Sequence, residues 1–82
     1  MKFYVSSDFP TILLGKSEKS GVILCIIGQV SDLITCNLVL PENTEGKESK
    51  WLLIDRLGAV NEYNSKEKAK AAARLRYDVI ER

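Results

Sequence analysis

The residue types that most often carry out enzymatic chemistry are scarce in this sequence. It contains no histidine, which removes the commonest general base, the commonest metal ligand and the usual activating partner of a cysteine. Two cysteines without histidine do not form a standard zinc site. We therefore expect a protein that is not an enzyme and that uses no metal and no cofactor. A carboxylate pair assembled by the fold is the one arrangement that the spacing leaves open, since the aspartates are spread along the chain at Asp8, Asp32, Asp55 and Asp78.

The tripeptide Gly15-Lys16-Ser17 matches part of a phosphate-binding loop. Such a loop needs a further glycine upstream and a helix whose N-terminus directs backbone amides at the phosphates. Residues 9–14 contain no glycine, and a strand pattern follows rather than a helix pattern. We therefore interpret residues 15–21 as an ordinary hairpin turn.

A basic stretch lies near the C-terminus and is the one local charge asymmetry in the chain. Residues 66–76 carry five cations, opposed by a single glutamate. Lys66, Lys70 and Arg74 recur at four-residue steps, so a helix would align them along one edge, where they could neutralise phosphates. Acidic residues share that outer face and no aromatic residues interleave for stacking on bases, which favours a solvated helix surface instead.

Arg76 and Trp51 are two further candidates for contact with a partner. Arg76 falls near the middle of the apolar face of the predicted helix, where it either reaches past its neighbours to water or pairs with Asp55 or Glu62. Trp51 follows a charged loop and either caps one end of the core or serves as an exposed anchor at an interface.

The densest apolar run is residues 21–40, around which we expect the other segments to pack. Residues 22–27 are apolar at every position and rich in β-branched side chains, which predicts a central strand covered on both sides. Residues 33–40 alternate, which predicts a second strand with one core face. With residues 29–32 as the turn, the two strands form a predicted β-hairpin.

The cysteines Cys25 and Cys36 lie one on each strand of this predicted hairpin. They would be diagonal neighbours about 7–8 Å apart, too far for an unstrained disulfide, although a turn shifted by one residue would place them opposite each other. We expect two buried, reduced thiols.

Further strands are predicted at residues 2–5, 51–54 and 59–63, with a weaker candidate at 11–14. Residues 41–50 are polar and form the longest predicted loop, which we expect to be mobile. Residues 64–82 predict a helix that Asn64 or Ser65 can cap. Its packing face on a helical wheel comprises Ala69, Ala72, Ala73, Leu75, Val79 and Ile80.

Together these patterns predict one α+β domain over residues 1–82. We expect a small antiparallel sheet of four to five strands with one C-terminal helix packed on a face, because the strand and helix patterns are segregated along the chain. The chain has 82 residues, 45% of them hydrophobic, and a net charge of +1, which argues against strong general attraction to nucleic acid or to an anionic membrane. With no apolar run of transmembrane length and no signal-peptide pattern at the start, we expect a cytoplasmic protein.

Three classes of function are consistent with these observations. The first is a small non-catalytic protein that acts by protein–protein interaction, such as an inhibitor, an adaptor or an accessory protein of a phage or mobile element. The second is a nucleic-acid-binding protein that uses the basic side of the C-terminal helix. The third is a homo-oligomeric structural subunit, for example a homodimer that pairs through a sheet edge or the Trp51 region.

Overall fold

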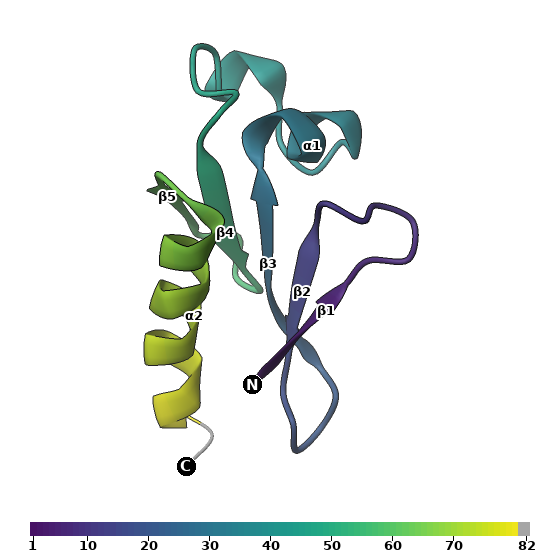
Figure 1. The fold of residues 1–82 in the computed structure, drawn as a ribbon, viewed down its shortest axis with the longest axis vertical. Helices are drawn as coiled ribbons and strands as arrows, with labels where there is room; N and C mark the ends of the chain where they lie inside the picture. The colour runs from purple at the N-terminus through teal and green to yellow at the C-terminus, as the bar shows by residue number, and fades with distance from the viewer. Residues whose placement is uncertain (81–82) are drawn as a thin grey trace.

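The computed structural model describes the backbone of residues 1–80 and the side chains of residues 1–78. Two short strands begin the chain, and a longer third strand leads directly into a short helix (Figure 1). In order, the elements are β1 (Lys2–Val5), β2 (Leu13–Lys16), β3 (Ile23–Gln29), α1 (Val30–Thr35), the 3-10 turn η1 (Pro41–Asn43), β4 (Trp51–Asp55), β5 (Val60–Tyr63) and α2 (Lys66–Ile80).

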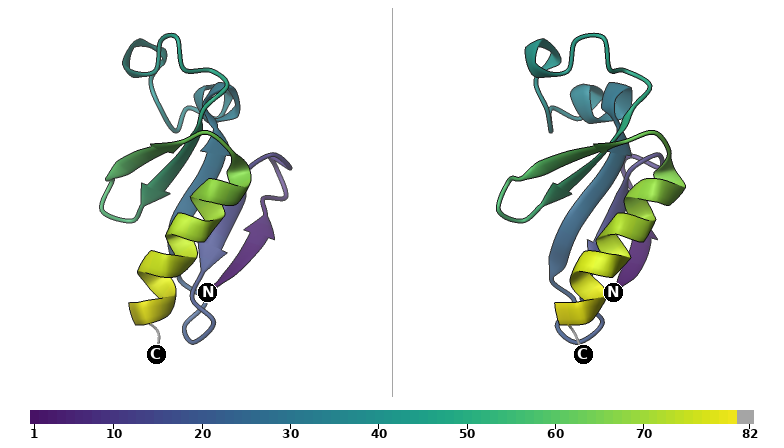
Figure 2. Two further views of the ribbon diagram at one scale, coloured as in Figure 1. Left: turned by 60° about the vertical axis from the view of Figure 1, so that its left-hand side comes forward. Right: turned by 90° about the vertical axis from the view of Figure 1, so that its left-hand side faces the viewer.

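Within residues 1–80 the strands form one five-stranded antiparallel sheet in which sequence neighbours pair, in the order β1-β2-β3-β4-β5. Antiparallel neighbours can be joined by short turns, so this meander needs no crossover. Helix α2 lies across one face of the sheet, as all three views show (Figures 1 and 2). The predicted α+β class, with its antiparallel sheet and C-terminal helix, is therefore confirmed.

The side chains between α2 and the sheet form the larger part of the core. Cys25 and Ile27 of β3 and Leu53 of β4 point toward α2, because alternate residues of a strand share a face. Ala69 and Ala73 of α2 are fully buried against them. Their small side chains let the helix backbone approach the sheet closely.

Helix α2 begins at Lys66, and Ser65 is its cap, since the Ser65 hydroxyl accepts a hydrogen bond from the Lys68 amide at 3.2 Å. The predicted packing face is wrong at one position. Tyr77 is buried at i+4 from Ala73, whereas Leu75 is 77% exposed. Residues 69, 73 and 77 define the buried stripe, and position 75 lies on the far side of the helix. The predicted helix end at residues 81–82 and the packing of Val79 and Ile80 lie outside the described residues and side chains.

A smaller core lies on the opposite face of the sheet, beneath α1. Val30 and Leu33 of this helix pack on Ile12 and Leu52. Gly28 makes the close approach possible, because a Cβ atom there would lie 2.9 Å from Leu33 Cδ2. The packing of α1 on the sheet therefore depends on a glycine at position 28.

The predicted hairpin of residues 22–27 with 33–40 is wrong. Residues 30–35 are helical, and β3 pairs instead with β2 and β4. The helix ends in a Schellman motif: Asn37 has a φ of 61°, and the amides of Leu38 and Asn37 donate to the carbonyls of Leu33 and Ile34. The strand prediction failed because Val30, Leu33 and Ile34 also match the helical spacing i, i+3, i+4, which buries one side of a single turn.

The cysteines consequently lie on opposite faces of the sheet rather than side by side. Cys25 is buried beneath α2, and Cys36 follows α1 in the other core; both are free thiols. The predicted diagonal pairing is wrong. Both thiols are free, as predicted, but only Cys25 is buried, because Cys36 is partly exposed.

Candidate protein-binding surface

The face of the sheet opposite α2 carries an apolar row that crosses every strand. Cross-strand partners share a face, and the register aligns these side chains from one edge to the other. We call this surface the open face; its row comprises Tyr4, Leu14, Ile26, Ile54 and Val60.

The open face is only partly covered. Helix α1 packs on the end of the sheet near Gln29 and leaves the other end accessible. Tyr4 on edge strand β1 is 47% exposed and Val60 on edge strand β5 is 51% exposed. Ile23 also lies on this surface. A bulge between Gly15 and Lys16 shifts the register by one residue, so Ile23 pairs with Lys16 instead of with the residue after it.

Basic side chains border the open face on its β1–β2 side. Lys16 lies diagonally across from Tyr4, with its ammonium nitrogen 5.2 Å from the centre of the tyrosine ring. Lys2 pairs directly with Lys16. Strands β1, β2 and β3 contain no acidic residue, so this half of the open face is positively charged.

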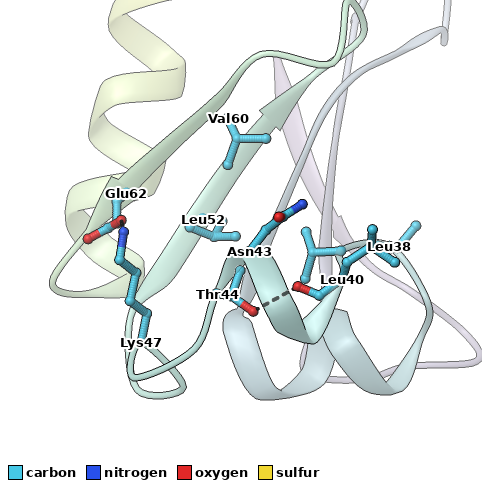
Figure 3. Close-up of a pocket in the computed structure, with 9 residues that line it drawn as sticks. Leu38, Leu40, Asn43, Thr44, Lys47, Leu52, Val60 and Glu62 are labelled. Carbon is cyan, nitrogen blue, oxygen red and sulfur yellow. Dashed lines mark hydrogen bonds and ion pairs between the residues drawn. The ribbon is translucent and has the colours of Figure 1, made fainter.

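A groove of about 420 Å³ lies over the β4–β5 half of the same face (Figure 3). Buried Leu52 and half-exposed Val60 line it on the sheet side, and the segment after α1 forms the opposite wall with Leu38 and Leu40. That irregular segment is held in place by Thr44, whose hydroxyl donates to the Leu40 carbonyl at 3.1 Å. The leucines and Val60 on the two walls make the groove mainly apolar.

Polar groups stand at one end of the groove. The ammonium group of Lys47 donates to the carboxylate of Glu62 at 2.7 Å, and this hydrogen bond lowers the pKa of Glu62. The pair joins the irregular segment to β5 across the groove end (Figure 3). Lys50 and Lys47 both lie on residues 36–50, a longer irregular stretch than the predicted 41–50, interrupted by η1. Its backbone is bonded to α1, since the Val30 amide donates to the Lys50 carbonyl at 2.9 Å.

Four predicted contact residues lie on α2: Lys66, Lys70 and Arg74 follow one another at four-residue steps, and Arg76 lies apart from them. Lys70 and Arg74 flank the ring of Phe3, at 5.5 and 5.0 Å from its centre. Lys66 is exposed in the first turn of the helix. Arg76 lies on the other flank, where its guanidinium is 3.7 Å from the Asp55 carboxylate, one of the two partners that the sequence predicted.

Trp51, the fifth predicted contact residue, is half-buried in β4 on the α2 face. It pairs with Gln29 on one side and Tyr63 on the other. Its indole packs against the larger core, which matches the core-capping interpretation rather than the exposed anchor.

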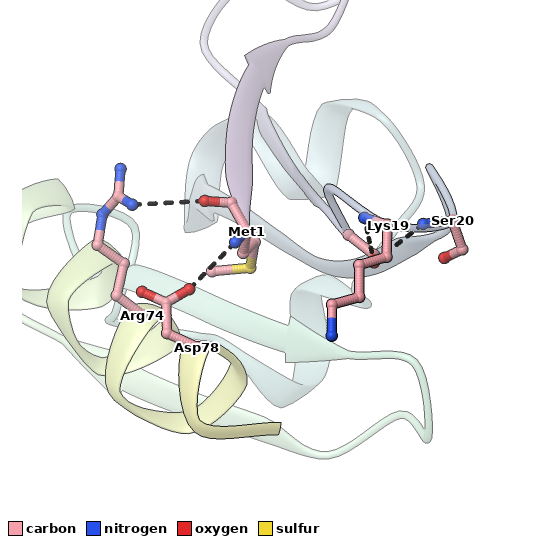
Figure 4. A network of polar contacts seen from close by, with 6 residues as sticks. Met1, Lys19, Ser20, Arg74 and Asp78 are labelled. Atoms are coloured by element: carbon pink, nitrogen blue, oxygen red, sulfur yellow. Dashed lines mark hydrogen bonds and ion pairs between the residues drawn. The ribbon is translucent and has the colours of Figure 1, made fainter. Parts of the chain in front are cut away.

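A polar network ties the start of β1 to α2 (Figure 4). The amino group of Met1 lies 3.1 Å from the Asp78 carboxylate, and Arg74 donates to the Met1 carbonyl at 3.5 Å. Separately, the Ser17 hydroxyl accepts hydrogen bonds from the amides of Lys19 and Ser20 within the β2–β3 turn. Gly15 and Lys16 are thus the last residues of β2, and the predicted hairpin turn begins at Ser17 and is followed by a strand.

The described residues hold little reactive chemistry. Burial raises the pKa of the Cys25 thiol to about 11, so it is protonated and unreactive at neutral pH. No group of three or more His, Cys, Asp or Glu side chains among residues 1–78 is arranged to hold a metal ion. None of the helices within residues 1–80 combines the length and apolar character needed to cross a bilayer.

The chain matches no protein-family model, and no curated protein or solved structure shows significant similarity to it.

Sequence reasoning did not identify the open face or the groove. Alternation in residues 2–5 could have identified Tyr4 as pointing away from Phe3. Leu57 was a further signal. Turns are usually formed by glycine, proline and small polar residues, so a leucine in the middle of the turn between β4 and β5 is unexpected.

Proposed function

We propose that the protein is a non-catalytic binding protein that acts by protein–protein interaction, in the manner of an inhibitor or adaptor. The observation that carries the proposal is the apolar row that crosses the whole sheet on the face opposite α2. Ile26 and Ile54, in the middle of the row, pack partly against the smaller core, and Tyr4 and Val60 at its two ends are about half exposed. Exposed apolar side chains grouped on one face often mark a binding surface. Residues such as Tyr4, which present an apolar body with a polar tip, are enriched at interfaces.

The charge of the β1–β3 half of the open face indicates the chemistry of the partner. Lys2 and Lys16 border this half, and no acidic residue from these strands opposes them. A partner with an apolar strip flanked by Asp or Glu would cover Tyr4 and Leu14 and meet the two ammonium groups at the rim. We therefore propose an acidic, amphipathic surface of another protein as the ligand.

A paired set of variants tests the proposal. Tyr4→Glu combined with Lys16→Glu places negative charge on the open face at exposed or half-exposed positions, without touching either core. Leu75→Glu is the control, because it adds a negative charge at an exposed leucine on the outer side of α2, away from the open face. Capture from native lysate should yield a partner with the wild type and with Leu75→Glu, and lose it with the double variant, while all three unfold at similar temperatures. Equal capture by the double variant would refute the proposal.

The nucleic-acid alternative has weaker support from the geometry. Lys70 and Arg74 are occupied with the Phe3 ring, and Arg76 points to Asp55 on the other flank of the helix. Titration of random DNA and RNA at about 50 mM salt tests it directly, because phosphate contacts are strongest at low salt. Tight binding that charge reversal at Lys66, Lys70 and Arg74 abolishes would favour that alternative over the open face.

A further inference from the structure

The β4–β5 hairpin carries an exposed apolar side chain in its turn and an unfilled apolar groove along one face of its strands. Leu57, in the turn, is 90% exposed. The groove, lined by Leu52, Val60 and Glu62 from the strands, runs along the hairpin from Val60, next to this turn, to the Leu52–Glu62 pair. The turn projects away from α2, to the same side as the segment that contains η1 (Figure 2).

The turn holds Leu57 in a defined position. The Asp55 carboxylate accepts hydrogen bonds from the amides of Leu57 and Ala59, each at 2.9 Å. Gly58 supplies the positive φ of 87° that the turn requires, and its amide donates to the Asp55 carbonyl. An anchor fixed in this way loses little conformational entropy when it binds.

We propose that the chain forms a two-fold symmetric dimer in which Leu57 of each copy occupies the groove of the other. A two-fold axis that runs across β4 and β5, between two open faces, places the turn of one copy over the groove end of its partner. One operation then fills both grooves and covers both anchors, as an isologous interface requires. Ile54, together with Val60 at the end of the groove nearest the turn, would meet its counterpart near the axis.

Charge complementarity supports a second copy as the occupant. Arg56, next to Leu57, is exposed and forms no ion pair with any described side chain. Glu62 lines the groove and is paired with Lys47, and Glu42 on η1 precedes the groove residue Asn43. The irregular segment at residues 41–50 carries three glutamates and two lysines, a net charge of −1. Insertion of Leu57 would bring the Arg56 guanidinium to these carboxylates.

The dimer would cover exposed apolar side chains that the monomer leaves in water, namely Leu38, Leu40, Leu57 and Val60. It leaves Tyr4 and Lys16, on the β1–β2 side, free for the partner proposed above. The two proposals therefore use different halves of the open face, and each can fail without the other.

Sedimentation equilibrium from about 1 µM to about 1 mM protein tests the dimer. The wild type should dimerise within this range. Leu57→Glu should raise the dissociation constant at least about 30-fold, the effect expected of a central anchor. Leu75→Glu, the matched control, should dimerise like the wild type. A wild type that stays monomeric at about 1 mM, or a Leu57→Glu variant that dimerises as strongly, would overturn the proposal.

A charge-swap series and a mixed-label experiment test the arrangement itself. Arg56→Glu should weaken the dimer, and adding Glu42→Arg to that variant should restore part of the affinity. In a mixture of isotope-labelled and unlabelled chains, intermolecular NOEs should join Leu57 methyl groups to those of Leu40 and Leu52. A dimer that lacks these NOEs would assign the groove to a different occupant and refute the arrangement.

Discussion

At the scale of single residues, Gly28 determines how the smaller core forms. A Cβ atom at this position would lie 2.9 Å from Leu33 Cδ2 and 3.3 Å from Ile12 Cγ1. Real Cβ atoms essentially never approach another atom within 3.0 Å, so a larger residue must displace the Leu33 side chain or the helix α1 that carries it. The glycine in β3 is therefore a packing requirement rather than a conformational one, because its φ is not positive.

We predict that Gly28→Ala lowers the free energy of unfolding by about 1–3 kcal/mol through overpacking. Urea unfolding followed by the fluorescence of Trp51, the single tryptophan, measures the change. Gly46→Ala is the control, since a Cβ there meets no atom within 4 Å and only its φ of 80° disfavours alanine. An unchanged urea midpoint for Gly28→Ala would show that α1 adjusts without cost.

The buried thiol of Cys25 should make the protein's stability depend on pH in the alkaline range. Burial raises its pKa from the ordinary 9.0 to about 11. Between pH 9 and 11 the unfolded chain releases a proton that the folded chain keeps, so stability should fall as pH rises through this window, by up to about 3 kcal/mol. Burial also raises the pKa of Tyr77, which acts in the same direction.

Urea unfolding at several pH values, with Cys25→Ala as the control, measures this contribution. The variant should be less stable at neutral pH because it leaves a small cavity, and its stability should fall less steeply above pH 9. Parallel profiles for the two proteins would assign the alkaline loss to other groups.

At the scale of elements, α2 depends on one capping interaction and one narrow stripe. The Ser65 hydroxyl satisfies the Lys68 amide, and Ala69, Ala73 and Tyr77 form the buried side. Among the other side chains of the helix up to Asp78, Ala72 is partly buried against the core and the rest are polar or exposed. Packing of the buried side, rather than helix propensity alone, must therefore hold the helix on the sheet.

We predict that Ser65→Ala destabilises the protein by about 1 kcal/mol, because a first-turn amide loses its acceptor. Ser65→Asp should retain most of the stability, since its carboxylate can accept the same hydrogen bond and favours the positive end of the helix dipole. Thermal unfolding followed by circular dichroism compares the variants. If Ser65→Ala unfolds like the wild type, Asn64 or water must replace the cap.

Residues 30–40 show how two elements can compete for one sequence. Their apolar residues satisfy strand alternation from 33 to 40 and helical spacing from 30 to 34. The helix forms because β3 already has β2 and β4 as hydrogen-bonded neighbours, which leaves no edge for a hairpin partner. Asn37, in the left-handed conformation at the C′ position, then ends the helix and directs the chain over the groove.

At the scale of the whole molecule, a five-stranded meander covered by one long helix leaves its two faces unequal. Helix α2 covers one face, and α1 covers one end of the other. Both edge strands, β1 and β5, have four residues each, and the central strand β3 has seven. Stability should therefore be concentrated in the middle of the sheet.

We predict that amide hydrogen exchange is slowest for Ile27 and Leu53, whose side chains are fully buried and whose strands have neighbours on both sides. Amides of β1 and β5 should exchange faster, because edge strands can open without global unfolding. Equal protection in all five strands would indicate that the sheet opens only as a unit, or that a partner copy protects an edge.

The sequence by itself determined those parts that depend on local chemistry. Strands at 2–5, 51–54 and 59–63, the turn at 15–21 and the helix after Ser65 were predicted within one or two residues, because propensity, turn residues and caps act over short distances. The weak strand at 11–14 was displaced by two residues, to 13–16. The α+β class followed from the same local patterns.

Only the tertiary structure decided the state of residues 30–40, the separation of the cysteines and the identity of the candidate surface. Each of these depends on which segments become neighbours: the pairing of β3 with β4 made α1 a helix, and the position of α2 left Tyr4, Leu57 and Val60 exposed. Exposure is a property of the assembled layers, so an apolar side chain in the sequence does not reveal whether it fills a core or faces a partner.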